Sequence, residues 1–255
     1  MSVIRNAAAR AHAEVAMAIK EEARRQLAEG GAAKLSLRAV ARELGMVSSA
    51  LYRFYPSRDE LLTALIIDGY NAIGQAAEQE LAASRETDPV ARWVAVCGAV
   101  RGWALAHPHE YALLYGSPVP GYAAPPDTVG PASRVALALF RVVEDAHRAG
   151  LVAVSGCDAG LPAPVADEAT QFLWSSDLVP ASALPRLLGV WAQLFGLISF
   201  DAFGRFERLV DSSDALFDHA VVELARQAGF RVDRASGEGR CQAKAEVGRP
   251  TATDG

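Results

Sequence analysis

Hydrogen-bond donors and positive charges gather between residues 36 and 60 of this 255-residue chain. Hydroxyl and guanidinium groups both donate to the oxygen atoms of anions such as phosphate. The donors are Ser36, Arg38, Ser48, Ser49, Tyr52, Arg53 and Arg58. The first sixty residues carry a net charge of +3 and the remainder −8, so these donors lie at the basic end of an acidic protein. This distribution favours an anionic partner at one end, although a merely uneven surface charge would have the same composition.

Two short helices should present these donors. They follow a long helix whose apolar stripe runs over residues 15–27 and which should end at Glu29–Gly31, because glycine accepts the left-handed cap conformation. Ser36 can cap the first short helix, and Gly45 should end it. The second is predicted from about Ser48 to Tyr55, where the following proline closes it. Two short helices around a glycine turn, behind a longer helix, describe a helix-turn-helix.

The rest of the chain also has helical patterns. Ser57 and Glu60 fit a capping box that should start a long helix. Further helices are expected at about 89–106, 110–116, 131–149, 164–176, 181–207 and 212–228. Proline- and glycine-rich stretches at 116–131 and 150–163 should be loops. No segment shows the alternation of a strand, so the sequence predicts an all-α fold.

Residues 15–70 resemble the DNA-binding segment of the tetracycline-repressor (TetR) family of transcriptional regulators. The resemblance is carried by the run LSLRAVARELGMVSSALYRFYPSRDELLTAL, residues 35–65. It implies a three-helix helix-turn-helix domain joined to an antiparallel helical domain that binds a small ligand and dimerises. We therefore expect an arm at 1–12, a DNA-binding domain at 13–73 with its helix-turn-helix at 36–55, a ligand-binding and dimerisation domain at 74–230, and a disordered tail at 231–255.

The resemblance also implies DNA contacts. The second helix of such a motif enters the major groove, and arginine is the usual two-bond partner of guanine. The residues that can reach bases or phosphates from this helix are Ser48, Ser49 and Arg53. Arg38 matches a base-contacting position of the family. The phosphate-contacting positions are matched by Ser36, Tyr52 and Arg58.

Phe54 departs from the family pattern, which usually has histidine or tyrosine followed by phenylalanine where this chain has Phe54-Tyr55. A phenyl ring cannot donate a hydrogen bond to phosphate. The contact is absent, passes to the Tyr55 hydroxyl, or is replaced by apolar contact with a thymine methyl group. The leader arginines, Arg5 and Arg10, either touch the DNA backbone or belong to a solvated arm.

A dimer interface is expected late in the chain. The segment Trp191–Phe203 is similar to a TetR subclass with a Trp…His-Gly signature, with Phe195 in place of the histidine. The helix at 187–200 is apolar nearly all round, which predicts burial on both sides and a two-fold dimer, unless the helix is simply internal to one chain. The predicted interface residues are Phe172 and Trp174 of a companion helix at 164–176, and Leu188, Trp191, Leu194, Phe195 and Ile198.

A small-molecule pocket is expected around the helix at 89–106. Side chains that combine apolar bulk with polar tips suit such a cavity. The candidates are Trp93, Cys97, Trp103, His107, Tyr111, Tyr115 and Phe140. Aromatic residues at helical spacing also form ordinary core, and His107 before Pro108 can cap a helix, so both interpretations remain open.

Cysteine use and hydropathy indicate the compartment. The three cysteines, Cys97, Cys157 and Cys241, are odd in number and widely spaced, which argues for a reducing environment and against a disulfide framework or zinc site. The amino terminus lacks the apolar stretch of a secretory signal. The longest apolar run, at 187–200, is shorter than the roughly 18–20 residues of a membrane span. A cytoplasmic protein without a membrane partner, metal or cofactor is expected.

The sequence therefore predicts a ligand-responsive DNA-binding regulator, most simply a repressor that a small molecule releases from a pseudo-palindromic operator. An enzyme is disfavoured because no GxSxG, HExxH, Walker or GxGxxG pattern occurs, and no catalytic residue is assigned. The histidines show no metal-like spacing beyond His107 and His109. The alternative is a helical small-molecule-binding or scaffold protein without DNA binding, which Phe54 leaves open.

Overall fold

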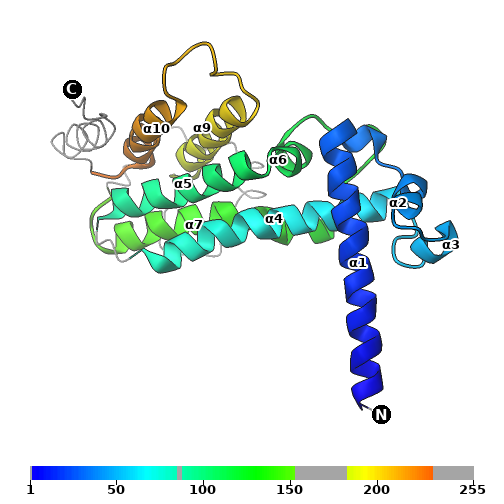
Figure 1. Ribbon diagram of the computed structural model, residues 1–255. Helices are drawn as coiled ribbons and strands as arrows, with labels where there is room; N and C mark the ends of the chain where they lie inside the picture. The colour runs from blue at the N-terminus through cyan, green and yellow to red at the C-terminus, as the bar shows by residue number, and fades with distance from the viewer. Residues whose placement is uncertain (1, 85–87, 153–182, 232–255) are drawn as a thin grey trace, which may run out of the picture. The chain divides into compact units, whose positions relative to one another are not determined.

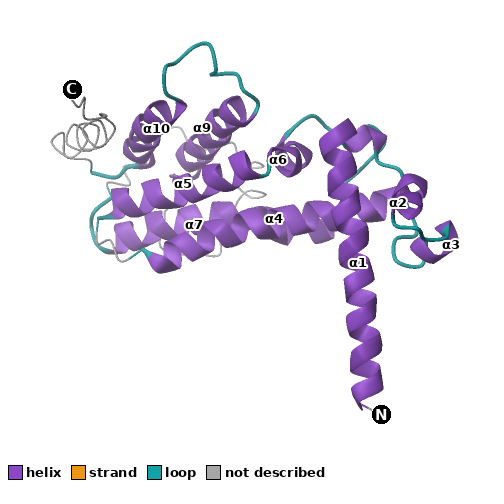
Figure 2. Cartoon of the chain, viewed as in Figure 1, coloured by secondary structure: helices purple, strands orange, loops and turns teal. Residues whose placement is uncertain are grey.

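The computed structural model describes residues 2–84, 88–152 and 183–231 (Figure 1). Regular structure in these ranges is helical, and the only pairing of extended residues among them is an isolated bridge between Val152 and Phe230 (Figure 2). The helices are α1 (Ser2–Gly30), α2 (Leu37–Glu43), α3 (Ser48–Leu51), α4 (Arg58–Ala83), α5 (Pro89–Ala106), α6 (Pro108–Tyr115), α7 (Val129–Arg148), α9 (Leu184–Ala202) and α10 (Ser213–Ala228), with 3-10 turns η1 (Ala32–Lys34) and η2 (Pro126–Thr128). The all-α prediction is confirmed. Within the described ranges, no helix has the length and apolar character needed to span a bilayer.

The described chain forms two compact units. The first comprises the residues up to Gly74 together with Ala104–Arg134, and the second comprises Gln75–Trp103 and the chain from Val135 onward. Residues 104–134, which sequence analysis placed in the ligand-binding domain, cluster with the first unit because α6 packs against α1. Helix α4 contributes residues to both units.

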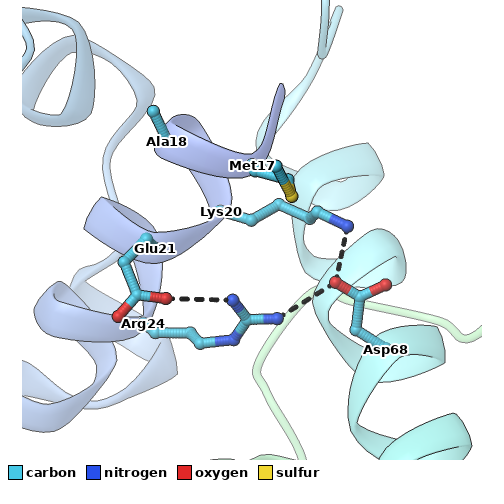
Figure 3. Close-up of a pocket in the computed structure, with 6 residues that line it drawn as sticks. All are labelled: Met17, Ala18, Lys20, Glu21, Arg24 and Asp68. Atoms are coloured by element: carbon cyan, nitrogen blue, oxygen red, sulfur yellow. Dashed lines mark hydrogen bonds and ion pairs between the residues drawn. The ribbon is translucent and has the colours of Figure 1, made fainter. Parts of the chain in front are cut away.

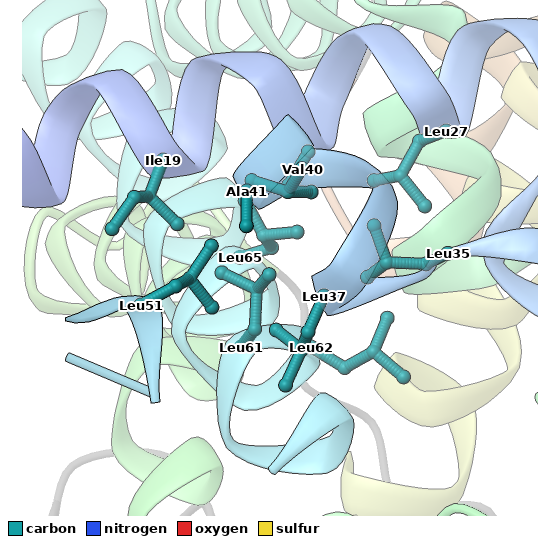
Figure 4. Packing of buried hydrophobic residues seen from close by; sticks show 11 residues of the cluster. Ile19, Leu27, Leu35, Leu37, Val40, Ala41, Leu51, Leu61, Leu62 and Leu65 are labelled. Carbon is teal, nitrogen blue, oxygen red and sulfur yellow. The ribbon is translucent and has the colours of Figure 1, made fainter. Parts of the chain in front are cut away.

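The core of the first unit lies where α1, α2, α3 and α4 meet (Figure 4). Each helix places its apolar stripe there, so the spacing seen in the sequence becomes one cluster. The buried residues are Ile19, Ala23, Leu27, Leu35, Leu37, Val40, Ala41, Leu51, Leu61, Leu62 and Leu65. These contacts hold the two short helices, which are too short to be stable alone.

The second unit packs α5 and α7 with the paired helices α9 and α10. Trp93 of α5 is 2% exposed, and its indole N–H donates to the Val221 carbonyl oxygen of α10 at 3.1 Å. Its ring centroid lies 5.7 Å from that of Phe230. Trp93 therefore links α5 to α10 and to Phe230, which follows α10.

Arg101 of α5 forms ion pairs with both α9 and α10. Its guanidinium contacts Asp201 at 2.6 Å and Asp214 at 2.7 Å and lies 4.8 Å from the Phe217 ring centroid. The Arg101 and Asp201 side chains are only 12% and 11% exposed. Burial acts to lower the pKa of Arg101, but the Asp214 and Asp201 carboxylates outweigh it and raise the pKa. No local pattern in the sequence reveals this cluster, because Arg101 lies a hundred or more residues before both aspartates.

Truncation of the Arg101 side chain should destabilise the second unit. We expect Arg101→Ala to lower the free energy of unfolding by about 2 kcal/mol, because it leaves Asp201 without its charged partner in a nearly buried position. Urea unfolding followed by circular dichroism measures the loss. Arg141→Ala, which removes an exposed arginine of α7 in the same unit, should change the value by no more than about 0.5 kcal/mol. Equal losses in the two variants would contradict the assignment.

Candidate nucleic-acid interface

Helix α2 turns an apolar face inward and a basic face outward. The Ser36 hydroxyl accepts a hydrogen bond from the Ala39 amide at 3.4 Å, so the predicted cap is confirmed. Val40 is fully buried against the core, whereas Arg38 is exposed. Because its opposite face is held by the core, α2 presents Arg38 to solvent.

A tight glycine turn sets the angle between α2 and α3. Gly45 has φ +64°, the left-handed conformation that a residue with a side chain rarely adopts. Its amide donates to the Arg42 carbonyl oxygen at 3.1 Å, and the Met46 amide donates to the Ala41 carbonyl oxygen at 2.8 Å. This pair of bonds is a Schellman motif, which ends α2 at the position predicted from the glycine.

Helix α3 is shorter than the sequence predicts. It ends at Leu51, not near Tyr55, and Tyr52 is its carboxy-terminal cap. The amides of Arg53 and Phe54 bond to carbonyl oxygens three residues earlier, which tightens the chain into a turn. Because Pro56 disfavours helical backbone at Tyr55, the helix cannot continue. Leu51 is the buried residue of α3, and Ser48, Ser49 and Tyr52 are exposed.

The arginines of the first unit fall into two groups. Arg24 and Arg25 pair with acidic side chains, and Arg42 pairs with neighbouring Glu43. Arg38 and Arg53 are both exposed, and neither forms a hydrogen bond or ion pair with any residue that the structure describes. Arg38 and Arg53, the two helix-turn-helix arginines that were predicted to contact DNA, therefore carry charges that no described acidic side chain neutralises.

Arg58 has an internal contact that sequence analysis did not foresee. Its guanidinium donates to the Ala32 carbonyl oxygen at 2.8 Å and lies 3.5 Å from Asp59. The Ser57 hydroxyl accepts from the Glu60 amide at 3.1 Å, which confirms the cap of α4. Arg58 therefore fastens the start of α4 to η1, and its contact with phosphate stays a prediction.

Phe54 and Tyr55 lie against the core of the first unit. Both rings are half-buried and pack on the cluster around Leu51. Burial and, to a smaller extent, the Asp68 carboxylate raise the pKa of Tyr55, and the Arg24 guanidinium opposes part of the rise. The Phe54 ring stacks on that of His12, with centroids 4.4 Å apart and planes 28° apart. No local sequence pattern indicates this pair, because His12 of α1 and Phe54 of the turn after α3 lie far apart along the chain.

An ion network connects α1, α4 and α6, and Figure 3 shows the part of it that lies between α1 and α4. Asp68 of α4 accepts from Lys20 at 2.6 Å and from Arg24 at 3.0 Å. Arg24 also contacts Glu110 of α6 at 2.9 Å. Burial opposes the charge on Arg24, but Glu110 and Asp68 outweigh it and raise the pKa. A hollow of about 430 Å³ adjoins this network, and Met17 is among the residues that line it.

The predicted pocket residues are divided between the two units. Trp93, Cys97, Trp103 and Phe140 lie in the second unit, and His107, Tyr111 and Tyr115 lie in the first. Burial raises the pKa of the Cys97 thiol far above its ordinary value. In the first unit, Tyr111 and Tyr115 do come together, with ring centroids 5.1 Å apart. A second hollow of about 480 Å³ involves His109 and the proline-rich loop, which sequence analysis did not select.

The predicted dimer residues of α9 are mostly turned inward. Leu194, Phe195 and Ile198 are buried, and Leu188 and Trp191 are half-buried. The exposed side of α9 carries small and polar residues, Gly189, Ala192, Gln193 and Gly196, followed by Phe200. Phe172, Trp174 and the helix predicted at 164–176 lie outside the described residues, so their part in an interface stays a prediction.

The described residues offer no metal site: no group of three or more histidine, cysteine, aspartate or glutamate side chains among them could hold an ion. The fold presents a helix-turn-helix, α2 and α3, that packs on α1 and α4, carries donors on its outer face and is followed by a second helical unit. This arrangement defines the class of helix-turn-helix DNA-binding regulators.

Comparisons with known proteins identify the family. Residues 19–65 match the bacterial regulatory proteins of the tetR family, and residues 93–224 match the tetracyclin repressor-like C-terminal domain. The chain is 40% identical over 220 residues to the HTH-type transcriptional regulators Rv1816 of Mycobacterium tuberculosis and Mb1846 of Mycobacterium bovis, covering 83% of this chain and 88% of each relative. The crystal structure of regulatory protein SCO4313 superposes with a TM-score of 0.68 at 35% identity, covering 84% of this chain and 97% of that one. The chain belongs to the TetR family and is a DNA-binding transcriptional regulator.

Proposed function

We propose that the protein is a homodimeric repressor that binds a pseudo-palindromic operator and is released by a small molecule. The observation that carries the proposal is the pair of exposed arginines, Arg38 and Arg53, that have no partner among the described residues. A guanidinium on a reading helix can make two hydrogen bonds to guanine or one to phosphate. Neighbouring Ser48 and Ser49, in the first turn of α3, would lie nearest the base edges.

A two-fold dimer would match the symmetry of a pseudo-palindromic operator. Two copies of α3 related by a two-fold axis would meet successive major grooves about 34–36 Å apart, if the simple spacing applies. The exposed side of α9, with Gly189, Ala192 and Gly196, offers a surface on which a second copy could pack closely. An added Cβ at Gly189 or Gly196 would meet no atom of another described element within 4 Å, so no described residue of the same chain covers these two positions.

Release by a ligand would require two conformers with different affinities for DNA. Helix α4 is the natural lever, because it starts beside the reading helix and continues into the second unit. In the first unit, Asp68 and Glu110 tie α4 and α6 to Arg24 of α1. A ligand that favours one position of α4 or α6 would thereby shift α1 and the motif packed on it.

Selection from a random duplex library tests the function without knowledge of the operator. The purified protein should enrich an inverted repeat, with half-sites separated by about one helical turn or a multiple of it. Sedimentation of the complex should show one protomer for each half-site. Enrichment of no common sequence would contradict the proposed function, and enrichment of a single unrepeated half-site would contradict the dimeric form of it.

A further inference from the structure

The stacked pair of His12 and Phe54 lies beside the reading helix. Phe54 follows α3 directly, and its ring is held by the core, so it offers His12 a fixed platform. The planes are 28° apart, so the face of the imidazole lies on the phenyl ring, and the ring nitrogens, whose hydrogen-bonding directions lie in the imidazole plane, are not aimed at that ring. His12 itself is exposed. The stack therefore orients a hydrogen-bond donor next to the position where Phe54 has none.

Helix α1 extends well beyond the core that it helps to form (Figure 1). Ile19 is the first fully buried residue among the α1 side chains that the structure describes, and His12 lies seven residues earlier, about 10 Å along the helix axis. The part of α1 before Ile19 is thus in contact, through His12, with the turn that carries Tyr52, Arg53 and Phe54. A long helix that leaves its core and touches this turn is well placed to reach the DNA backbone.

The charges around His12 leave it available to an anion. It has no hydrogen bond or ion pair within the described ranges. The α1 residues one turn away are uncharged: Ala8, Ala9, Val15 and Ala16. The charged groups nearest in sequence are Arg10, Glu14 and, beside Phe54, Arg53. Glu14 lies two positions along the helix and so points to a different side of α1.

We propose that His12 supplies from α1 the DNA phosphate contact that Phe54 cannot make. The inference rests on the proposed operator binding. An imidazole nitrogen that carries a hydrogen donates a hydrogen bond to a phosphate oxygen, whereas a phenyl ring has no donor. Because the contact is made to the DNA backbone, it should add affinity for any duplex and no sequence preference.

The variant His12→Phe separates donation from packing, because it retains a ring for the Phe54 stack and removes both nitrogens. Binding is measured on the duplex selected from the library and on a random duplex of equal length, at several salt concentrations. A phosphate contact carries no sequence information, so the variant should show roughly tenfold weaker affinity for both duplexes.

The control is His109→Phe, which replaces an exposed histidine of α6 in the same unit. It should keep the wild-type affinity for both duplexes, whereas His12→Phe should not. Unchanged affinity of His12→Phe for both duplexes would overturn the inference. A loss of affinity confined to the selected duplex would also overturn it, because that marks a base contact. Wild-type protein that binds neither duplex would instead refute the proposed function.

Discussion

Replacement of both Arg38 and Arg53 by alanine should abolish sequence-specific DNA binding and leave the fold intact. Each well-placed arginine contact with a base contributes about 1–3 kcal/mol of discrimination, and a dimer carries two copies of each residue. We therefore expect affinity for the selected duplex to fall at least about 100-fold. Fluorescence anisotropy with labelled duplex measures this loss.

The matched control is the double variant Arg141→Ala and Arg205→Ala, which removes two exposed arginines from the second unit. It lowers the net charge by the same amount, so it corrects for long-range attraction between protein and DNA. Thermal unfolding of all variants should be alike, because none of the four side chains is buried. If both double variants lost affinity equally, bulk charge and not the reading face would explain the binding.

Leu51→Ala should cause the largest loss of stability in the first unit. Leu51 is fully buried and is the buried anchor of the four-residue helix α3. Leucine-to-alanine changes in a core cost about 2–5 kcal/mol, and we expect about 3 kcal/mol here. Hydrogen exchange should show faster exchange of the amides at 47–55 even where the rest of the unit remains folded.

Leu209→Ala is the control for this change, because Leu209 is 73% exposed. The same atoms are removed, but no cavity forms, and the free energy of unfolding should change by no more than about 0.5 kcal/mol. DNA affinity should fall for Leu51→Ala and not for Leu209→Ala. A Leu51→Ala protein with normal exchange at 47–55 and normal DNA affinity would show that α3 is positioned by other contacts.

Local signals in the sequence predicted the parts of the site that local chemistry determines. Ser36 and Ser57 are caps, and Gly45 ends α2, because each acts on backbone groups within three or four residues. The length of α3 was overestimated because the apolar pattern continues to Tyr55, although the chain there is already a turn. A half-buried ring in a turn and one in a helix leave the same pattern.

Contacts between distant segments could not be predicted in this way. Nothing near Arg58 indicates that it bonds to Ala32, and nothing near Arg101 indicates Asp201. Likewise, α6 packs against α1 in the first unit, and its Glu110 pairs with Arg24, although the two residues are 86 apart in the sequence. Phe54 was recognised as unusual from the sequence, but the stacked His12 became visible only in the folded chain.

The most direct test compares the protein's affinity for the DNA upstream of its own gene with its affinity for a random duplex of equal length, across a range of salt concentrations. The account predicts a preference of about a thousandfold or more, together with a steep fall in affinity for both duplexes as salt rises. Equal affinity for the two duplexes at every salt concentration, or binding that does not respond to salt, would contradict it.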